Sequence, residues 1–258
     1  MDFRTILVKD NPPVRTITLN RPERRNAMTQ AMRTELISAL EDTAVSDCRV
    51  LILTGAGEAF CSGLDLSELE SLHGKTSAEH RIDADQLARL FMTLYELPIP
   101  TIAAVQGAAI AGGTGLAMVC DFALATPSAK FGFPEVRIGF VPALVSAFLS
   151  LQAGEKVCRE LLLTGRVFGA DEAQRYGLVN EVVGIDQLMT RAKSLAEDLL
   201  ANSSQAMRAT KQLLAAQNRS WLQSAIAVAI EASTESRLTS DFHEGISAFL
   251  GKRKPVWK

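Results

Sequence analysis

The sequence predicts an α/β fold followed by a purely helical C-terminal region. Up to about residue 190, short apolar or alternating runs typical of strands lie between stretches with helical spacing, which is the pattern of a sheet with crossover helices. Beyond that point only helical spacing remains. The chain has 258 residues, 47% hydrophobic and 22% charged, so it can bury the core of one large domain with an appendage.

The first predicted elements are two strands with a helix between them. Residues 14–19 (VRTITL) alternate β-branched and polar side chains, as in a half-buried strand, and Pro22 ends the pattern. Residues 27–44 carry apolar side chains at helical spacing. Residues 50–53 (VLIL) form a continuous apolar run, which is typical of a strand covered on both faces.

The same alternation continues through the middle of the chain. Residues 82–97 have the spacing of an amphipathic helix, and two prolines follow. Residues 101–105 (TIAAV) predict a buried strand. The glycine-rich residues 107–115 open a helix that we expect to reach about Cys120. Residues 122–125 predict a fourth short strand, so the order favours parallel strands joined by crossovers.

The C-terminal region is expected to be helical from Gln187 to the end. Its helices are too apolar to stand alone, as residues 225–230 (AIAVAI) show. We therefore expect them to pack on a further surface, for which another subunit is the leading candidate.

Charge and composition exclude several classes of function. The net charge of −2 gives no general attraction to nucleic acid or to anionic membranes. The opening segment lacks the apolar core of a signal peptide, and no apolar run is long enough to span a membrane. The four cysteines lie far apart and the chain has three histidines, so no metal site is expected. These features predict a reduced, cytoplasmic protein.

Common catalytic and nucleotide-binding motifs are missing. Gly55 and Gly57 follow a strand, but the third glycine of a dinucleotide fingerprint would fall at Phe60. The sequence has neither a phosphate-binding loop with its lysine nor a G-x-S-x-G elbow. Cys61 has no histidine near it in sequence, which favours a packed cysteine over a nucleophile.

Two glycine-containing turns are the first candidates for a functional site. Residues 60–66 (FCSGLDL) and 107–115 (GAAIAGGTG) each follow a predicted strand and precede a helix. The first N–H groups of a helix lack partners within the helix, so two such turns side by side would offer two convergent donors to an anionic oxygen. Glycine-rich turns also occur for packing alone, and the pattern leaves both interpretations open.

Glu135 is the candidate acid–base residue. It follows Pro134 within the apolar stretch at residues 131–139 (FGFPEVRIG), which predicts partial burial and a raised carboxyl pKa. An ion pair with Arg137 or another cation is the structural alternative.

Taken in order, ten segments resemble the crotonase (enoyl-CoA hydratase/isomerase) superfamily. Each one alone is common, whereas the ordered set is highly specific. They are LNRP (19–22), NA (26–27), FCSGLDL (60–66), PTIAAVQG (100–107), AGG (111–113), CD (120–121), FGFPE (131–135), LTG (163–165), EG (244–245) and KR (252–253).

The resemblance implies a spiral of repeated ββα units over residues 1–196. It also implies a helical assembly region over residues 197–258 that forms a homotrimer or a hexamer of two trimers. Substrates would be acyl thioesters of coenzyme A, with no separate cofactor. The shared chemistry would be stabilisation of a thioester enolate by two backbone N–H groups.

The resemblance also assigns roles to individual residues. The oxyanion donors would be the N–H groups of Leu64 and Gly112. Those expected to contact coenzyme A are Arg24, Arg25, Ser62, Gly63, Asp65, Leu66 and, from the basic tail of a neighbouring subunit, Lys252.

One position departs from the two-glutamate hydratase pattern. Where hydratases of the family usually carry a second glutamate, this chain has Gly115. We expect the space left there to admit water or a branched or carboxylated acyl group. A single Glu135 suits an isomerase that moves a double bond, whereas residues 133–143 resemble bacterial hydratases acting on 3-methylglutaconyl-CoA and 3-hydroxy-3-methylglutaryl-CoA. RNA binding, shown by a few relatives, is the remote alternative, which the net charge and the 6% aromatic content disfavour.

Overall fold

The strands form two sheets in the computed structural model, which describes residues 3–71 and 74–258. The larger sheet has the order β1-β2-β3-β4-β6-β9 and the smaller has β5-β7-β8. The strands are β1 (Ile6–Asn11), β2 (Val14–Leu19), β3 (Val50–Gly55), β4 (Thr101–Val105), β5 (Ala108–Ile110), β6 (Phe122–Ala125), β7 (Lys130–Gly132), β8 (Val167–Gly169) and β9 (Glu181–Val182). The α-helices are α1 (Gln30–Val45), α2 (Leu66–Ser71), α3 (Ser77–Tyr95), α4 (Gly112–Val119), α5 (Ala143–Thr164), α6 (Ala170–Arg175), α7 (Leu188–Leu200), α8 (Ser204–Ser236) and α9 (Ser240–Leu250). Short 3₁₀ helices are η1 (Pro22–Arg24), η2 (Pro134–Ile138) and η3 (Ile185–Gln187).

Successive ββα units build this pair of sheets. In each unit one strand joins the larger sheet, the next segment joins the smaller one, and a helix returns the chain. β4, β5 and α4 form one unit, and β6, β7 and α5 form another. After β3, Cys61 makes a parallel bridge to Ala109 of β5, so this unit has the same path with a single bridging residue. The expected ββα repeat is confirmed.

The larger sheet is covered on both faces, as the apolar runs of β3 and β4 predict. Leu51 and Leu53 of β3 point into the main hydrophobic core, whereas Val50 and Ile52 point to the opposite face. Helix α7 covers that opposite face. The alternation follows from the two-residue period of a strand.

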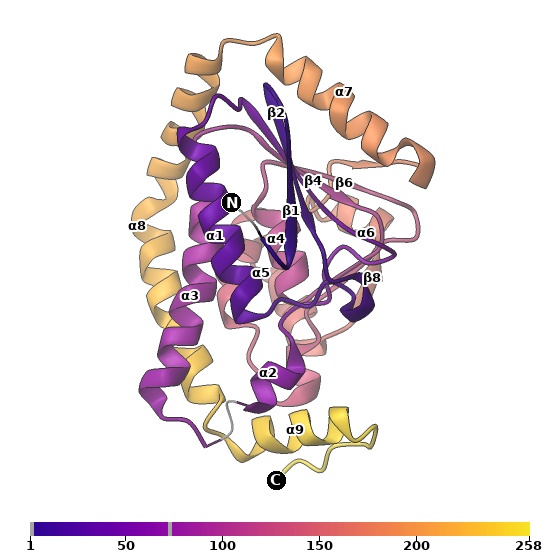
Figure 1. Cartoon of the computed structure of the whole chain (residues 1–258). Coiled ribbons are helices and arrows are strands. Elements are labelled where there is room, and N and C mark those ends of the chain that lie inside the picture. The colour runs from indigo at the N-terminus through magenta and orange to yellow at the C-terminus, as the bar shows by residue number, and fades with distance from the viewer. Residues whose placement is uncertain (1–2, 72–73) are drawn as a thin grey trace.

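The remaining helices pack on the main core as a layer. Helices α1, α3 and α8 run side by side along one flank in Figure 1, and α7 lies apart from them at the top. Leu222, Ile226 and Ile230 of α8 belong to the same hydrophobic cluster as the first helices of the chain. The C-terminal helices expected from the sequence are therefore present, and α8 completes the core of its own chain.

Sequence patterns located four strands and most of the long helices, but they missed the 22-residue helix α5 and five strands. The four predicted strands and the helical C-terminal region are confirmed, but α3 begins five residues before the expected Ile82. β1, β5, β7, β8 and β9 were not predicted. Four of them have two or three residues, too few to show a period, so partners elsewhere in the sheets determine them.

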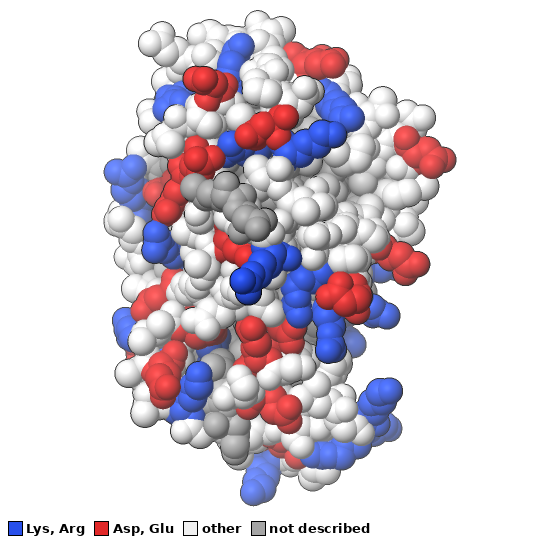
Figure 2. Space-filling view, in the orientation of Figure 1, with Lys and Arg blue, Asp and Glu red and all other residues white. Residues whose placement is uncertain are grey.

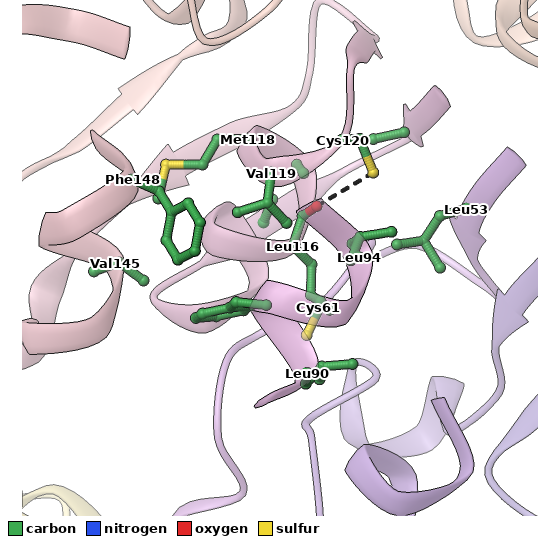
Figure 3. Close-up of a cluster of buried hydrophobic side chains, with 14 of the residues drawn as sticks. Leu53, Cys61, Leu90, Leu94, Leu116, Met118, Val119, Cys120, Val145 and Phe148 are labelled. Carbon is green, nitrogen blue, oxygen red and sulfur yellow. Dashed lines mark hydrogen bonds between the residues drawn. The ribbon is translucent and has the colours of Figure 1, made fainter. Parts of the chain in front are cut away.

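The cysteines are buried packing residues. Figure 3 shows Cys61 and Cys120 among leucine, valine and phenylalanine side chains, with the Cys120 thiol 3.4 Å from the Leu116 carbonyl oxygen. Burial raises the pKa of the Cys61 thiol to about 12. A thiol that stays protonated is a poor nucleophile, which confirms the interpretation of Cys61 as structural.

The surface carries both signs of charge. Figure 2 shows Lys and Arg side chains interspersed with Asp and Glu over most of the face in view, with no wide field of one sign. Of the helices that the structure describes, none has the length and hydropathy to cross a membrane.

A buried charge cluster ties α3 to its neighbours. Asp83 of α3 accepts hydrogen bonds from Arg33 of α1 and, at 2.7 Å, from Arg237, which follows α8. Both arginines are buried. Burial works to raise the pKa of Asp83, but the two arginines outweigh it, so the pKa is lowered and the carboxylate stays ionised.

Asp83→Asn should therefore destabilise the protein strongly, because it removes the carboxylate between two buried guanidinium groups. We expect a loss of about 3–5 kcal/mol in the free energy of unfolding, measured by urea denaturation. Glu231→Gln is the control. It breaks the exposed Arg81–Glu231 pair between α3 and α8 and should cost no more than about 1 kcal/mol. Equal losses in the two variants would contradict a special role for the buried cluster.

Candidate active site

Backbone hydrogen bonds bring the two glycine-containing turns together. The Cys61 N–H donates to the Ala108 carbonyl oxygen at 3.0 Å, and the Ile110 N–H donates to the Cys61 carbonyl oxygen at 2.9 Å. A Cβ atom built on Gly63 would lie 2.9 Å from Ala111 Cβ and 3.7 Å from Gly112 N. The predicted convergence of the turns is therefore present.

The N–H groups of Leu64 and Gly112 are free to bind a ligand. In the described part of the chain, neither donates to a backbone carbonyl oxygen, and both residues line the same cavity. Ala111, just before Gly112, has φ 55° and ψ −123°, a conformation that residues with a Cβ rarely adopt. Such strain is typical of functional sites, and here it directs the first N–H of α4.

Buried side chains fasten the segments that carry these donors. Asn26, fully buried, donates to the carbonyl oxygens of Ala56 and Ala59 and accepts from the Arg21 N–H. The Arg21 guanidinium bonds to the Asp65 carboxylate at 3.0 Å, next to Leu64 in sequence. Arg21, which belongs to the LNRP segment at residues 19–22, thus holds the first glycine-containing turn (residues 60–66) in place.

The turns open into a cavity of about 440 Å³ that is mostly apolar. Sequence reasoning missed most of its walls, because they come from segments far apart in the chain that carry no motif. The lining residues are Arg25, Ser62, Leu64, Leu66, Leu69, Leu87, Ile110, Ala111, Gly112, Pro134, Glu135, Arg137, Ile138, Phe140, Val141, Pro142, Ala143, Leu144, Val145, Ser233 and Phe249.

Glu135 reaches this cavity from η2, a 3₁₀ helix (Pro134–Ile138) that Gly139 caps in the left-handed conformation. The side chain is buried, and its Oε2 atom has no hydrogen-bond partner. Burial raises the pKa of Glu135 from 4.5 to about 7, an effect that a hydrogen bond with its own backbone only partly offsets. No salt bridge joins it to Arg137 in the described structure, so the structural alternative for this carboxylate is not observed.

The other predicted site residues fall into two groups. Arg25, Ser62 and Leu66 line the cavity with the two donors and Glu135. Arg24 and Asp65 instead line a neighbouring hollow beside α2, and Lys252 is exposed beyond α9. Gly63, with φ 91°, shapes the first turn.

The expectation of open space at Gly115 is wrong. A Cβ atom there would lie 2.7 Å from Phe91 Cζ and 3.0 Å from Val145 Cγ1. Gly115 is buried in the first turns of α4, and the Phe91 side chain fills the position that a second glutamate would need. Glu135 therefore faces the cavity without a carboxylate partner from this position.

Two convergent N–H donors beside one buried carboxyl group suit reactions through an enolate. The donors can stabilise negative charge on a thioester oxygen, and a carboxyl group with a pKa near 7 can take and return a proton. In the described residues, no group of three or more His, Cys, Asp or Glu side chains is placed to hold a metal ion.

Comparisons with known proteins agree with this arrangement. The enoyl-CoA hydratase/isomerase family model matches residues 9–258. A putative enoyl-CoA hydratase of Thermus thermophilus is 42% identical, over 94% of this chain and 96% of its own. The 2,3-dehydroadipyl-CoA hydratase of Escherichia coli is 35% identical over 98% of both chains. The crystal structure of an enoyl-CoA hydratase/isomerase from Xanthobacter autotrophicus Py2 superposes with a TM-score of 0.90 at 31% identity, covering 98% of both chains.

The fold is thus the crotonase spiral, with the oxyanion-hole turns and the carboxyl group on one cavity. The protein belongs to the enoyl-CoA hydratase/isomerase family.

The buried Glu135 should cost stability at high pH. Its folded-state pKa of about 7 lies above the unfolded value of 4.5, so the folded protein binds the proton more tightly and stability falls as pH rises between these values. Glu135→Gln should therefore unfold with a larger free energy than wild type at pH 8, by up to about 3 kcal/mol, and with nearly the same free energy at pH 4.5. Chemical denaturation at the two pH values measures this. A gain that does not depend on pH would show that the carboxylate is not the cause.

Proposed function

We propose that the protein is a cytoplasmic hydro-lyase that adds water to an enoyl-CoA, or removes it from a 3-hydroxyacyl-CoA, through a thioester enolate. The observation that carries the proposal is the unpartnered Oε2 of Glu135 in a cavity that also exposes the N–H groups of Leu64 and Gly112. The names of the relatives, most of them enoyl-CoA hydratases, support it.

One carboxylate can serve both proton transfers. Glu135 takes a proton from water as the water oxygen bonds to Cβ, and the electron pair of the double bond moves toward the thioester carbonyl. The N–H groups of Leu64 and Gly112 hold the resulting enolate oxygen, each stabilising it by about 3 kcal/mol. Glu135 then gives the proton to Cα, so the net change is addition of one water molecule.

The substrate we propose has a branched, carboxylated acyl group, as in 3-methylglutaconyl-CoA, which hydration converts to 3-hydroxy-3-methylglutaryl-CoA. The resemblance of residues 133–143 to that hydratase branch supports it. The name of the Escherichia coli relative, a 2,3-dehydroadipyl-CoA hydratase, also specifies a carboxylated acyl group.

An enoyl-CoA isomerase is the second candidate. The lack of a second glutamate at position 115 favours it. Phe91 fills the place of the second glutamate, and moving a double bond needs only one base between the α and γ carbons. Purified protein tested on 2-enoyl-CoA, 3-hydroxyacyl-CoA and 3-enoyl-CoA thioesters separates the two functions. Turnover of the 3-enoyl thioester without hydration would replace our proposal with the isomerase.

The assembly we propose is a homotrimer or a hexamer of two trimers, with residues 197–258 as the assembly region. Exposed apolar side chains on α8 and α9 support it, among them Leu213, Trp221, Val228 and Phe249. Phe249 and Ser233 also line the cavity, so this region contributes to the acyl-CoA site of its own chain as well.

Glu135→Gln should lower the hydration rate by about 100-fold or more, because the amide cannot act as a base. Affinity for a saturated acyl-CoA should change little. In the wild type, kcat/KM should rise with pH through about 7 as Glu135 ionises. Steady-state assays from pH 5.5 to 9 measure both effects. Retention of more than half of the activity would remove Glu135 from the mechanism.

Arg25 and Arg24 should differ in their effect on coenzyme A thioesters. Arg25 lines the cavity and Arg24 does not, and a guanidinium group suits phosphate oxygens. Arg25→Ala should raise KM for a coenzyme A thioester more than Arg24→Ala does. Neither substitution should change KM for the matching pantetheine thioester, which lacks the nucleotide phosphates. An equal effect on both thioesters would point to a role in folding.

A further inference from the structure

The buried charge cluster of Arg33, Asp83 and Arg237 lies directly behind one wall of the acyl cavity. Leu87 and Ser233 line the cavity, and each is four residues, or about one helical turn, from a member of the cluster: Leu87 from Asp83 on α3, and Ser233 from Arg237 at the end of α8. Residues four apart lie on the same face of a helix. Asp83 therefore shares a face of α3 with Leu87, and Arg237, at the end of α8, shares a face with Ser233.

Positive charge exceeds negative charge in the cluster. Arg33 and Arg237 are 2% and 0% exposed and share the Asp83 carboxylate. The Nε and Nη1 atoms of Arg33 and the Nε and Nη2 atoms of Arg237 have no hydrogen-bond partner. His80 adds no further charge near neutral pH, because burial and Arg237 lower its pKa. A buried guanidinium group without a full set of acceptors is costly, and a second anion nearby would offset that cost.

Phe140 connects this charge to the cavity. Its ring lines the cavity, and its centroid lies 5.4 Å from Arg237 Cζ on the cluster side. Arg237 itself is covered, so an anion in the cavity would interact with it across Phe140 and Ser233. Electrostatic attraction is weakly screened at such a distance when the intervening material is apolar. Ser233, which is 3% exposed, is the lining residue on this wall whose side chain carries a hydroxyl group that can donate a hydrogen bond to an anion.

We propose that Arg237 selects acyl groups that carry a carboxylate at the end remote from the thioester, with Ser233 as the residue that binds the carboxylate. The inference rests on one part of the proposed function, namely that the ligand is an acyl-CoA. The phosphates of coenzyme A lie at the other, Arg25-lined part of the site in that proposal, so the acyl end is the remaining source of an anion. The positive charge also offsets the repulsion between such a carboxylate and ionised Glu135.

Binding of two saturated thioesters tests the proposal without turnover. Glutaryl-CoA and pentanoyl-CoA have acyl chains of equal length and differ at the terminal group, a carboxylate in the first and a methyl group in the second. By isothermal titration calorimetry, we expect the wild type to bind glutaryl-CoA at least about tenfold more tightly. Equal binding, or tighter binding of pentanoyl-CoA, would overturn the proposal with no variant needed.

Variants then assign the preference to its residues. Arg237→Met removes the charge but keeps an unbranched side chain, and it should abolish the preference, mainly by weakening binding of glutaryl-CoA. Arg237→Lys should retain most of the preference, and Ser233→Ala should reduce it about threefold or more. Arg81→Met, which removes an exposed arginine from α3, is the control and should leave it unchanged. If the preference for glutaryl-CoA survives in both Arg237→Met and Ser233→Ala, the assignment to these residues is refuted. If Arg237→Met does not fold, an unchanged preference in Ser233→Ala refutes the assignment by itself.

The result is separable from failure of the proposed function. Tighter binding of glutaryl-CoA by a protein that hydrates no enoyl-CoA would refute the hydro-lyase and support the carboxylate site. Hydration of crotonyl-CoA by a protein that binds the two saturated thioesters equally would support the hydro-lyase and refute the carboxylate site.

Discussion

The close approach of two backbone turns is the constraint on which the rest of the site depends. A Cβ atom on Gly113 would lie 2.1 Å from the Cys61 carbonyl oxygen, and one on Gly112 would lie 2.7 Å from Met28 Cε. Only glycine permits this spacing. Because the Cys61 segment pairs with β5, the N–H groups of Leu64 and Gly112 face the same cavity. The candidate oxyanion site that we propose is therefore a consequence of how one ββα unit packs against the next.

The position of Glu135 depends on an equally close contact at the other side of the cavity. Cβ atoms on Gly139 and Gly245 would lie 2.2 Å from the backbone of α9 and of η2, respectively. This contact lets α9 pack on η2, the element that carries Glu135. Burial of the Glu135 carboxyl group is the cause of its raised pKa. The same burial that tunes the acid–base group costs folding free energy, so function and stability are opposed at this residue.

The helical layer contributes both a buried charge cluster and part of the cavity wall. Arg33, Asp83 and Arg237 link three elements that are distant in sequence, and the neighbouring turns of α3 and α8 supply Leu87 and Ser233 to the cavity wall. A substitution in the cluster would therefore affect the two helices that supply this part of the cavity wall.

The sequence by itself determined four strands, most of the long helices, the family resemblance and the two turns with Glu135, because periodicity, glycine-rich turns and ordered motifs are local features. It could not determine β5, β7 or β8, whose three residues each carry no period and are strands only because other strands pair with them. It also placed open space at Gly115, where Phe91 from a distant helix fills the position. The cavity walls at Phe140, Ser233 and Phe249, and the excess charge behind them, exist only in the tertiary structure, since burial and ion pairing depend on segments up to about 200 residues apart.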